Sequence, residues 1–348
     1  MNKEKKNTRG ITLIALVITV IVLLVLAGVT IVALSGDNGI LTRAKNAKDQ
    51  TQIASIEEQK QLIQISASMN TATYLYEDSY KNQKIQVPIP EGFSVSSIAG
   101  ESKAEEGLVV MDSLGNEFVW IPILDEKEYQ RNLNYPSSYE SYLEYTPTNS
   151  TFTDTGYLPD AIQPEIDTAL SNEEAEKAAV LKYHGFYISR YEAGNSNGKI
   201  VSKKDSNVWI NINYTSAKSI SKNMYNTDKV QSALCSGIQW DMIMKFVNEK
   251  MDGKNETFDV KTINIKRHMG KLLQTGENES DRVQNIYDLE GNCNEWVAER
   301  TSIKNESYVN RGGYFEKKYG ITASARNSNG DNEYNRKSFR VVLYVIWY

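Results

Sequence analysis

Oxygen-bearing groups gather in one short turn near the C-terminal end of the chain, which reads DLEGNCNE from Asp288 to Glu295. Asp288 and Glu295 supply carboxylates, and Gly291 tolerates the positive φ that lets the carbonyls of Gly291 and Cys293 turn inward. Such oxygens are the ligands that Ca²⁺ prefers. The turn therefore predicts a Ca²⁺ site at Asp288, Gly291, Cys293 and Glu295. The alternative is a tight turn whose carboxylates cap neighbouring amides, because the spacing is not that of an EF-hand loop.

A second set of candidate residues lies between Tyr314 and Ser338, a segment rich in Asn, Ser, Tyr and charged residues. Tyrosine offers rigid contact area, and Asn and Ser offer adaptable hydrogen bonds, so this composition is typical of a recognition surface. The candidate ligand-binding residues are Tyr314, Glu316, Tyr319, Asn327, Asn329, Asp331, Asn332, Tyr334 and Asn335. The alternative is an exposed loop that is polar because loops usually are.

Several other kinds of site are disfavoured by composition. The formal charge of -5 argues against a nucleic-acid partner, which usually requires a basic face. The two histidines, His184 and His268, are too far apart in sequence to suggest a zinc site. Cys235 and Cys293 allow at most one disulfide bridge, which is no disulfide scaffold.

The motifs around these residues resemble the formylglycine-generating, sulfatase-modifying enzyme family. They run in the order Phe118 to Pro122, Gly185 to Glu192, Ser236 to Asp241, Asp288-Leu289-x-Gly291-Asn292-x-x-Glu295-Trp296, Arg311-Gly312-Gly313 and Phe339-Arg340-Val341-Val342-Leu343. The resemblance covers roughly Leu108 to Tyr344. It implies an α+β fold of the C-type-lectin-like, sulfatase-modifying type.

The chain departs from that family at the residues that matter for catalysis. The oxidising members bind copper through two cysteines between the R-G-G and F-R motifs, and Tyr314 to Ser338 contains no cysteine here. No copper is therefore expected, and we interpret the domain as a binding module without that catalysis. The segment also resembles the variable region of C-type-lectin-like proteins diversified by retroelements. An oxidoreductase of the formylglycine-generating type, including the relatives that use iron, remains the enzymatic alternative.

The elements that must position these residues follow from local patterns. Residues 108–123 predict a hairpin around Leu114-Gly115-Asn116, residues 186–191 predict a strand, and residues 215–224 and 238–250 predict helices, the second with Trp240 in the core. Residues 71–107 are expected to form a linker with one edge strand at Val87 to Pro90. Residues 124–180 form an insertion whose part from Asp125 to Val180 holds twelve acidic and three basic residues. A solvated loop ending in a helix is expected there, with a second contact surface as the alternative.

The N-terminal region predicts a membrane anchor. Residues 1–10 carry Lys3, Lys5, Lys6 and Arg9, and the apolar run 11–34 would make about 36 Å of helix, enough to cross a bilayer. The basic residues place its N-terminal end in the cytoplasm, so the rest of the chain would lie outside the cell. A cleaved signal peptide is the alternative, but the apolar run is too long for one.

Arg9 to Ile14 resembles the class III signal of type IV pilins. That resemblance implies cleavage by prepilin peptidase between Gly10 and Ile11, residues 1–10 being the leader, and a stalk helix over residues 35–70. Ala15 occupies the fifth mature position, where the pilin family has a glutamate that pairs with a neighbouring subunit, so assembly with pilin-like subunits is in question.

Together these patterns predict a single-pass protein of the cell membrane with a lectin-like domain over residues 108–348. Its expected function is non-catalytic adhesion or recognition of an extracellular glycan or protein. A structural minor pilin is a further alternative.

Overall fold

The structure is a computed structural model, and it describes residues 16–24, 43, 47–48, 50–51, 74–132, 175–249, 270–300, 308–315 and 323–345. The chain divides into two compact units, Met1–Leu62 and Ile63–Tyr348. The cleavage site expected at Gly10 and Ile11 lies outside the described residues.

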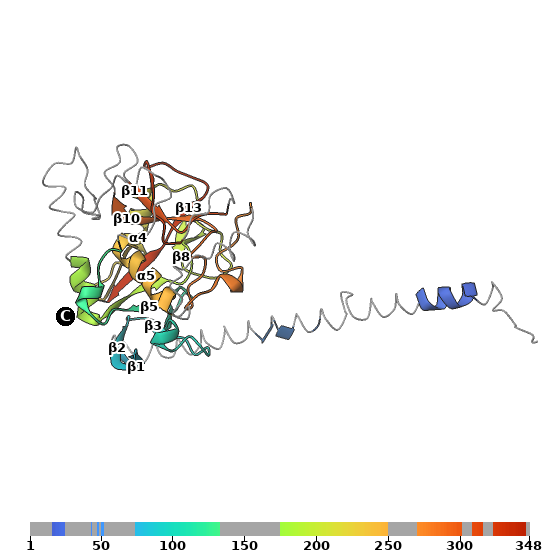
Figure 1. The fold of residues 1–348 in the computed structure, drawn as a ribbon, viewed down its shortest axis with the longest axis horizontal. Coiled ribbons are helices and arrows are strands. Elements are labelled where there is room, and N and C mark those ends of the chain that lie inside the picture. Colours follow the sequence, from blue (N-terminus) through green and yellow to red (C-terminus); the bar gives the residue numbers. More distant parts are fainter. Residues whose placement is uncertain are drawn as a thin grey trace, which may run out of the picture. The chain divides into compact units, whose positions relative to one another are not determined.

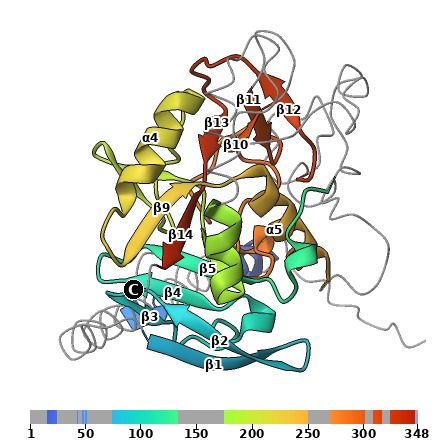
Figure 2. The same ribbon diagram turned by 90° about the vertical axis from the view of Figure 1, so that its left-hand side faces the viewer.

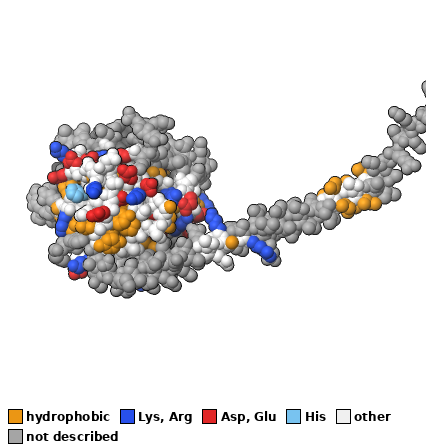
Figure 3. Space-filling model, turned by 90° about the horizontal axis from the view of Figure 1, so that it is seen from below, with side chains coloured by type: hydrophobic (Ala, Val, Ile, Leu, Met, Phe, Trp, Pro, Cys, Tyr) orange, Lys and Arg blue, Asp and Glu red, His pale blue; other side chains and the backbone are white. Residues whose placement is uncertain are grey.

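In the first unit, residues 16–24 form a helix. Their large apolar side chains are exposed, Leu24 to 68%, and this apolar surface is visible in Figure 3. Among the described residues, no helix combines the length and the apolar character needed to span a membrane. The remainder of the predicted 11–34 span and most of the predicted 35–70 stalk are not described, so the anchor stays a prediction.

The second unit has an α+β fold organised around a six-stranded antiparallel sheet (Figures 1 and 2). Its strand order is β3-β4-β5-β6-β14-β9. The strands are β3 (Phe93–Val95), β4 (Val109–Asp112), β5 (Glu117–Pro122), β6 (Gly185–Ser189), β9 (Val230–Leu234) and β14 (Val341–Val345). The closing strand β14 lies between β6 and β9, so the two ends of the domain sequence meet in one sheet.

A second sheet of four strands, in the order β12-β11-β10-β13, carries the candidate residues Glu295, Asn327 and Asn329. Its strands are β10 (Asn294–Arg300), β11 (Tyr308–Arg311), β12 (Asn327–Asn329) and β13 (Lys337–Phe339). Two small hairpins complete the β-structure: β1 (Tyr74–Tyr80) with β2 (Gln83–Ile89), and β7 (Gly194–Ser196) with β8 (Lys199–Val201). The β1–β2 hairpin lies at the opposite end of the domain from β11 and β12 (Figures 1 and 2).

The hairpin and both helices expected from the sequence are confirmed. Val109 of β4 pairs with Val119 of β5, and Asp112 Oδ1 accepts hydrogen bonds from the amides of Leu114 and Asn116, which closes the turn between them. Helix α4 (Tyr214–Met224) is capped by Asn213.

Helix α5 (Gly237–Glu249) supplies the middle of the core. Trp240 is fully buried, and its indole N–H donates to the carbonyl of Ala323 at 2.9 Å. Its predicted core role is therefore confirmed. Residues 175–183 are helical as well, as expected for the end of the insertion, whose part 133–174 lies outside the described residues.

Residues 74–107 are part of the folded domain and are not a linker. Strand β3 pairs with β4 inside the six-stranded sheet, and Val87 and Ile89 of β2 are fully buried in the core. The Pro88 carbonyl accepts a hydrogen bond from the Tyr187 hydroxyl at 3.1 Å. The β2 strand does lie at an edge, as its prolines indicated, but its apolar side chains are needed to cover the sheet.

Candidate functional site

The turn that suggested calcium is a tightly folded loop in which Asp288 and Asn292 have positive φ, 54° and 50°. Asx residues tolerate this left-handed backbone better than most others. The Gly291 N–H donates to the Gly312 carbonyl at 2.7 Å, which joins the turn to the R-G-G motif. Gly312 itself has φ of +90°, and a Cβ there would lie 3.2 Å from the Leu289 carbonyl oxygen. A glycine is therefore required where the two motifs touch.

Glu295, a predicted calcium ligand, faces a guanidinium. Both of its carboxylate oxygens accept from Arg340 Nε, at 2.8 and 2.9 Å, and neither side chain is exposed to solvent. Arg340 also donates to the carbonyls of Ser189, Arg190 and Tyr287. The oxygen atoms that converge here thus surround an internal cation supplied by the F-R motif.

Asp288 and Cys293, two of the other predicted ligands, have partners of their own. Asp288 Oδ2 accepts from the Gly276 N–H at 2.8 Å, and the Cys293 N–H donates to Glu192 Oε1 at 2.9 Å. Among the described residues, no group of three or more His, Cys, Asp and Glu side chains is arranged to hold a metal ion. Calcium at this turn remains a prediction from the sequence, and an ion there would have to compete with Arg340 for Glu295.

Glu192 is the residue of this cluster that the sequence analysis did not select. It follows β6, is fully buried, and accepts from Asn292 Nδ2 at 2.6 Å as well as from the Cys293 amide. Burial, followed by the negative charges of Asp288 and Glu295, raises the pKa of Glu192 well above its ordinary value. Burial likewise raises the pKa of Glu295 to about 7, against the opposing effect of Arg340. Glu192 ends the Gly185 to Glu192 motif, but only the fold shows that its carboxylate contacts the turn.

The two cysteines do not form a disulfide: both are free thiols, and both are fully buried. Burial raises the pKa of Cys235 and of Cys293 well above the ordinary thiol value. Both groups therefore stay protonated at neutral pH, whereas a nucleophile or soft-metal ligand must be a thiolate.

The arginine of the R-G-G motif belongs to a buried ionic network. Arg311 contacts Asp241 at 2.5 Å and Glu299 at 3.2 Å, and Arg326 contacts the same two carboxylates at 2.6 and 2.8 Å. Burial opposes ionisation of Glu299, but Arg326, Arg131 and Arg311 together lower its pKa below the ordinary value. The network ties α5 to the four-stranded sheet, so Arg311 has a structural role.

Most of the described recognition residues that reach the surface lie on residues 330–336, here called the 330–336 loop. Asn332, Glu333 and Asn335 are exposed, and Asp331, Tyr334 and the nearby Tyr314 are partly exposed. The backbone of the loop is fixed at several points. The Asn211 N–H donates to the Tyr334 carbonyl at 2.9 Å, and the Asn294 N–H donates to the Arg336 carbonyl at 2.9 Å.

Side chains hold the 330–336 loop at its two ends. Asp331 accepts hydrogen bonds from the amide and the hydroxyl of Thr215 at the start of α4. At the other end, the Lys337 ammonium lies 4.1 Å from the ring centre of Trp296 and 4.0 Å from that of Tyr334. The Arg336 guanidinium lies 4.6 Å from the ring centre of Tyr314. These cation–π contacts hold Tyr334 against Lys337 and Tyr314 against Arg336, the two basic residues that follow Asn335 in the sequence.

Not every predicted ligand-binding residue belongs to this surface. Asn327 is only 3% exposed, because it pairs with Asn310 in the four-stranded sheet. Asn327 therefore does not belong to the exposed recognition surface expected from the sequence. Asn329 is partly exposed, and its side-chain oxygen accepts from Asn310 Nδ2 at 2.8 Å and from Lys337 Nζ. Glu316 and Tyr319 lie outside the described residues.

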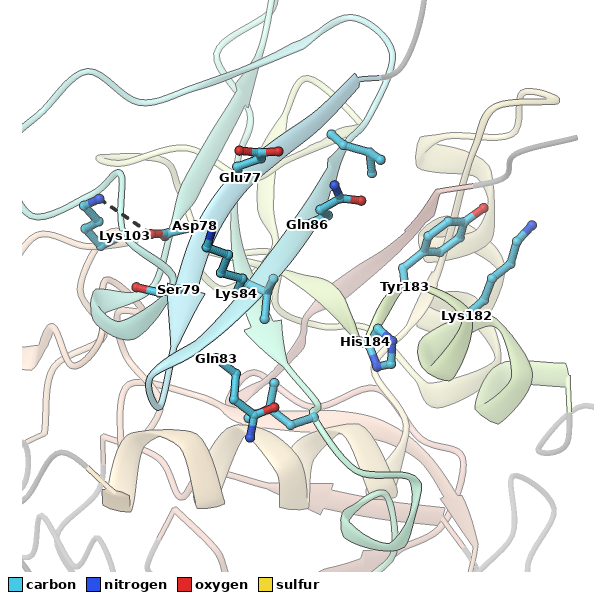
Figure 4. Close-up of a pocket in the computed structure, with 13 residues that line it drawn as sticks. Glu77, Asp78, Ser79, Gln83, Lys84, Gln86, Lys103, Lys182, Tyr183 and His184 are labelled. Carbon is cyan, nitrogen blue, oxygen red and sulfur yellow. Dashed lines mark ion pairs between the residues drawn. The ribbon is translucent and has the colours of Figure 1, made fainter.

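A wide hollow of about 1200 Å³ lies elsewhere, between the β1–β2 hairpin and residues Lys182 to His184 (Figure 4). Its labelled side chains carry both charges, and Lys103 pairs with Asp78 at 3.5 Å. The hollow is open and mixed in charge, and the side chains drawn do not converge on one point. The described side chains of this hollow therefore do not indicate a particular ligand or reaction.

Comparisons with known proteins leave the family open. No family model matches the chain, and no curated protein matches it. A solved structure described as the crystal structure of CarF matches 46% of this chain and 87% of its own chain, at 14% identity and a TM-score of 0.34. A similarity at this level carries no argument about function.

Proposed function

We propose that this chain is a non-catalytic, ligand-binding protein of the cell surface. Its C-terminal unit would be a C-type-lectin-like domain of the sulfatase-modifying type, and it would recognise an extracellular glycan or protein. The binding surface consists of the exposed side chains of the 330–336 loop together with Tyr314. The observation that carries the proposal is that this polar and aromatic loop is exposed while its backbone is bonded to buried elements.

Rigidity is what makes this loop suitable for binding. A loop that is already ordered loses little conformational entropy when a ligand arrives, so more of the contact energy appears as affinity. Asp331 and Lys337 restrain the two ends of the loop, whereas Asn332, Glu333 and Asn335 between them point to solvent. Exposed amides beside tyrosine rings suit the hydroxyl groups of a glycan and the backbone of a protein alike.

The absence of catalysis is supported by the thiol chemistry. The sequence between Arg311 and Arg340 contains no cysteine, and the two cysteines of the chain are buried thiols with raised pKa. The ionisable groups of the turn are engaged in hydrogen bonds and ion pairs that hold the fold together.

Display at the surface rests on the N-terminal sequence. A basic segment followed by an apolar run predicts one membrane crossing with the large unit outside. The Arg9 to Ile14 signal would make prepilin peptidase a transient partner.

Binding can be tested with the full-length chain in nanodiscs, labelled and applied to a glycan array and to an array of purified extracellular proteins. The double variant Asn332→Ala/Asn335→Ala should weaken the captured interaction by about tenfold or more, since hot-spot side chains are each worth 1 kcal/mol or more. Asn223→Ala, an exposed asparagine on α4, is the matched control and should bind as the unaltered chain does.

The enzymatic alternative has its own assay. Oxidation of a cysteine-containing peptide by the chain in the presence of oxygen and copper or iron would overturn the proposal, even if the arrays also showed binding.

A further inference from the structure

A buried lysine connects the two edge strands of the four-stranded sheet. Lys337 belongs to β13 at one edge of this sheet, and Asn329 belongs to β12 at the other edge. Lys337 is only 2% exposed, and its Nζ donates a hydrogen bond to Asn329 Oδ1. An amine and a side-chain amide are therefore in direct contact inside the domain.

The register of the sheet brings these two side chains together. Trp296 of β10 pairs with Asn310 of β11, and Lys337 pairs with the residue two positions before Trp296. Residues two positions apart on a strand share a face, so Lys337, Trp296 and Asn310 project from the same side of the sheet. Asn329 lies two positions after the β12 partner of Asn310, which places Asn329 on that side as well.

Aromatic rings surround the amine. The Lys337 ammonium lies 4.1 Å from the ring centre of Trp296, which is fully buried, and 4.0 Å from that of Tyr334. The two rings attract the charged form and fix the direction of the side chain. Removal of an amine from water favours the neutral form, which is the nucleophilic one. The surroundings of Lys337 thus position a potential nucleophile.

The amide that Lys337 contacts is polarised from a third strand. Asn310 of β11 is fully buried, and its Nδ2 donates to Asn329 Oδ1 at 2.8 Å. A donor aimed at a carbonyl oxygen stabilises the negative charge that develops there when a nucleophile adds to the carbonyl carbon. Asn310 therefore occupies the position of an oxyanion donor for an attack by Lys337 on Asn329.

We propose that Lys337 and Asn329 join in an intramolecular amide bond. The neutral Nζ attacks Cγ of Asn329, and the Asn310 Nδ2–H stabilises the oxyanion. The bond from Cγ to the side-chain nitrogen then breaks, and that nitrogen leaves as ammonia with a proton taken from Nζ. One amide replaces another, so the reaction needs no oxidant, reductant or further reactant.

The bond would close a ring that contains the whole 330–336 loop, because residues 329 and 337 flank this loop on its two sides. Covalent closure restricts the conformations of a loop, and a restricted loop loses less entropy when it binds a ligand. This benefit for recognition rests on the proposed function, whereas the bond itself does not.

The test is tryptic digestion of the denatured full-length chain, followed by mass spectrometry. Trypsin cleaves after arginine and after unmodified lysine. The bond predicts a branched peptide in which residues 327–336 are joined to residues 337–340 with the loss of one ammonia, without cleavage after Lys337. Separate linear peptides, with Asn329 either intact or hydrolysed to aspartate, would overturn the proposal. The readout needs no ligand, so it is independent of whether the 330–336 loop binds a glycan or a protein.

Variants then test the role of each residue. Lys337→Arg and Asn329→Ala should yield only linear peptides. Asn310→Ala should slow bond formation by about a hundredfold, the usual effect of removing one oxyanion donor, in chain sampled at intervals after cell-free synthesis into nanodiscs. Asn335→Ala, an exposed asparagine of the loop, is the matched control and should form the bond as fast as the unaltered chain. Equal rates for Asn310→Ala and Asn335→Ala would refute the role of Asn310. The result for the unaltered chain does not depend on the folding of any variant.

Discussion

Glu295 and Arg340 show how much of the motif chemistry in this chain serves the fold. Each belongs to a different motif, and each is completely buried, so each ion needs the other to offset its loss of hydration. Arg340 adds hydrogen bonds to three backbone carbonyls, those of Ser189 and Arg190 at the end of β6 and that of Tyr287 just before the turn. A charged residue in such a motif therefore does not indicate catalysis when buried partners already neutralise its charge and accept or donate its hydrogen bonds.

We predict that Glu295→Ala destabilises the domain by about 3–5 kcal/mol, because it leaves the Arg340 guanidinium buried without a counter-charge. Urea unfolding followed by tryptophan fluorescence measures the change. Glu333→Ala, an exposed carboxylate, is the control and should change stability by no more than about 0.5 kcal/mol. Similar midpoints for the two variants would contradict the structural role of the pair.

Glu192 predicts a pH dependence of stability. Its pKa is raised in the folded chain above the ordinary 4.5, so the folded state holds a proton that the unfolded state releases. This contribution is fully present below pH 4.5 and is lost as the pH rises through the raised value. Asp288, Glu295 and Arg340 are the charged groups around it, and the raised pKa of Glu117 acts in the same direction.

Melting temperatures at about pH 5 and about pH 8 test this expectation. The Glu192→Gln variant should show a smaller decrease between the two conditions than the unaltered chain, and Glu333→Gln should show the same decrease. An unchanged slope in Glu192→Gln would mean that Glu192 does not hold the extra proton.

The calcium interpretation makes a separate prediction at Asp288. If the turn binds Ca²⁺ in addition to Arg340, calcium chloride raises the melting temperature of the intact chain by mass action, and Asp288→Ala removes the increase. Differential scanning fluorimetry with magnesium chloride as the control distinguishes this from a general salt effect. No response of the intact chain would leave Arg340 as the only cation of the turn.

At the scale of elements, the start of α5 depends on a glycine. A Cβ on Gly237 would lie 2.2 Å from Glu299 Oε2 and 2.5 Å from Arg131 Nη1, so the helix and the buried network can approach only without a side chain there. We predict that Gly237→Ala destabilises the domain by about 3 kcal/mol, because it must displace a buried charge pair. Ser219→Ala, on the exposed side of α4, is the control for helix propensity. If urea unfolding shows an equally small loss of stability for both substitutions, Gly237 does not lie as close to Glu299 and Arg131 as the structure indicates.

Elements with a clear local pattern could be predicted, and those defined by their neighbours could not. The 108–123 hairpin and the helices near 215–224 and 238–250 follow from strand and helix periodicity. Strand β3 is too short to show a period, so its segment looked like a linker. Strand β12 is Asn-Ser-Asn, a composition that favours a loop, and only its pairing with β11 makes it a strand.

The candidate site likewise combines features that the sequence predicts with features that it does not. The turn and the R-G-G and F-R motifs can be identified from their residues, but the contacts between these motifs cannot. Glu192 meets Asn292 across 100 positions of sequence, and Arg326 meets Asp241 across 85. Nothing in local spacing indicates such pairs, because they depend on how the two sheets pack.

For the whole molecule, the prediction concerns location. The full chain should sediment with membranes and resist extraction by high salt, because an apolar run such as residues 11–34 binds the bilayer through the hydrophobic effect and not through charge. Deletion of residues 1–34 should release the remainder into the soluble fraction. Added protease should digest the large unit in intact cells, and protection until the cells are lysed would contradict outward display.

The 330–336 loop has one more consequence. The contacts that fix it use backbone atoms, Asp331 and Lys337, while the side chains of Asn332, Glu333 and Asn335 make no hydrogen bond to the described part of the domain. Replacement of these three side chains should therefore change the stability of the domain very little. A lineage carrying this protein could change its specificity by point mutation, one position after another, without first acquiring compensating mutations in the core.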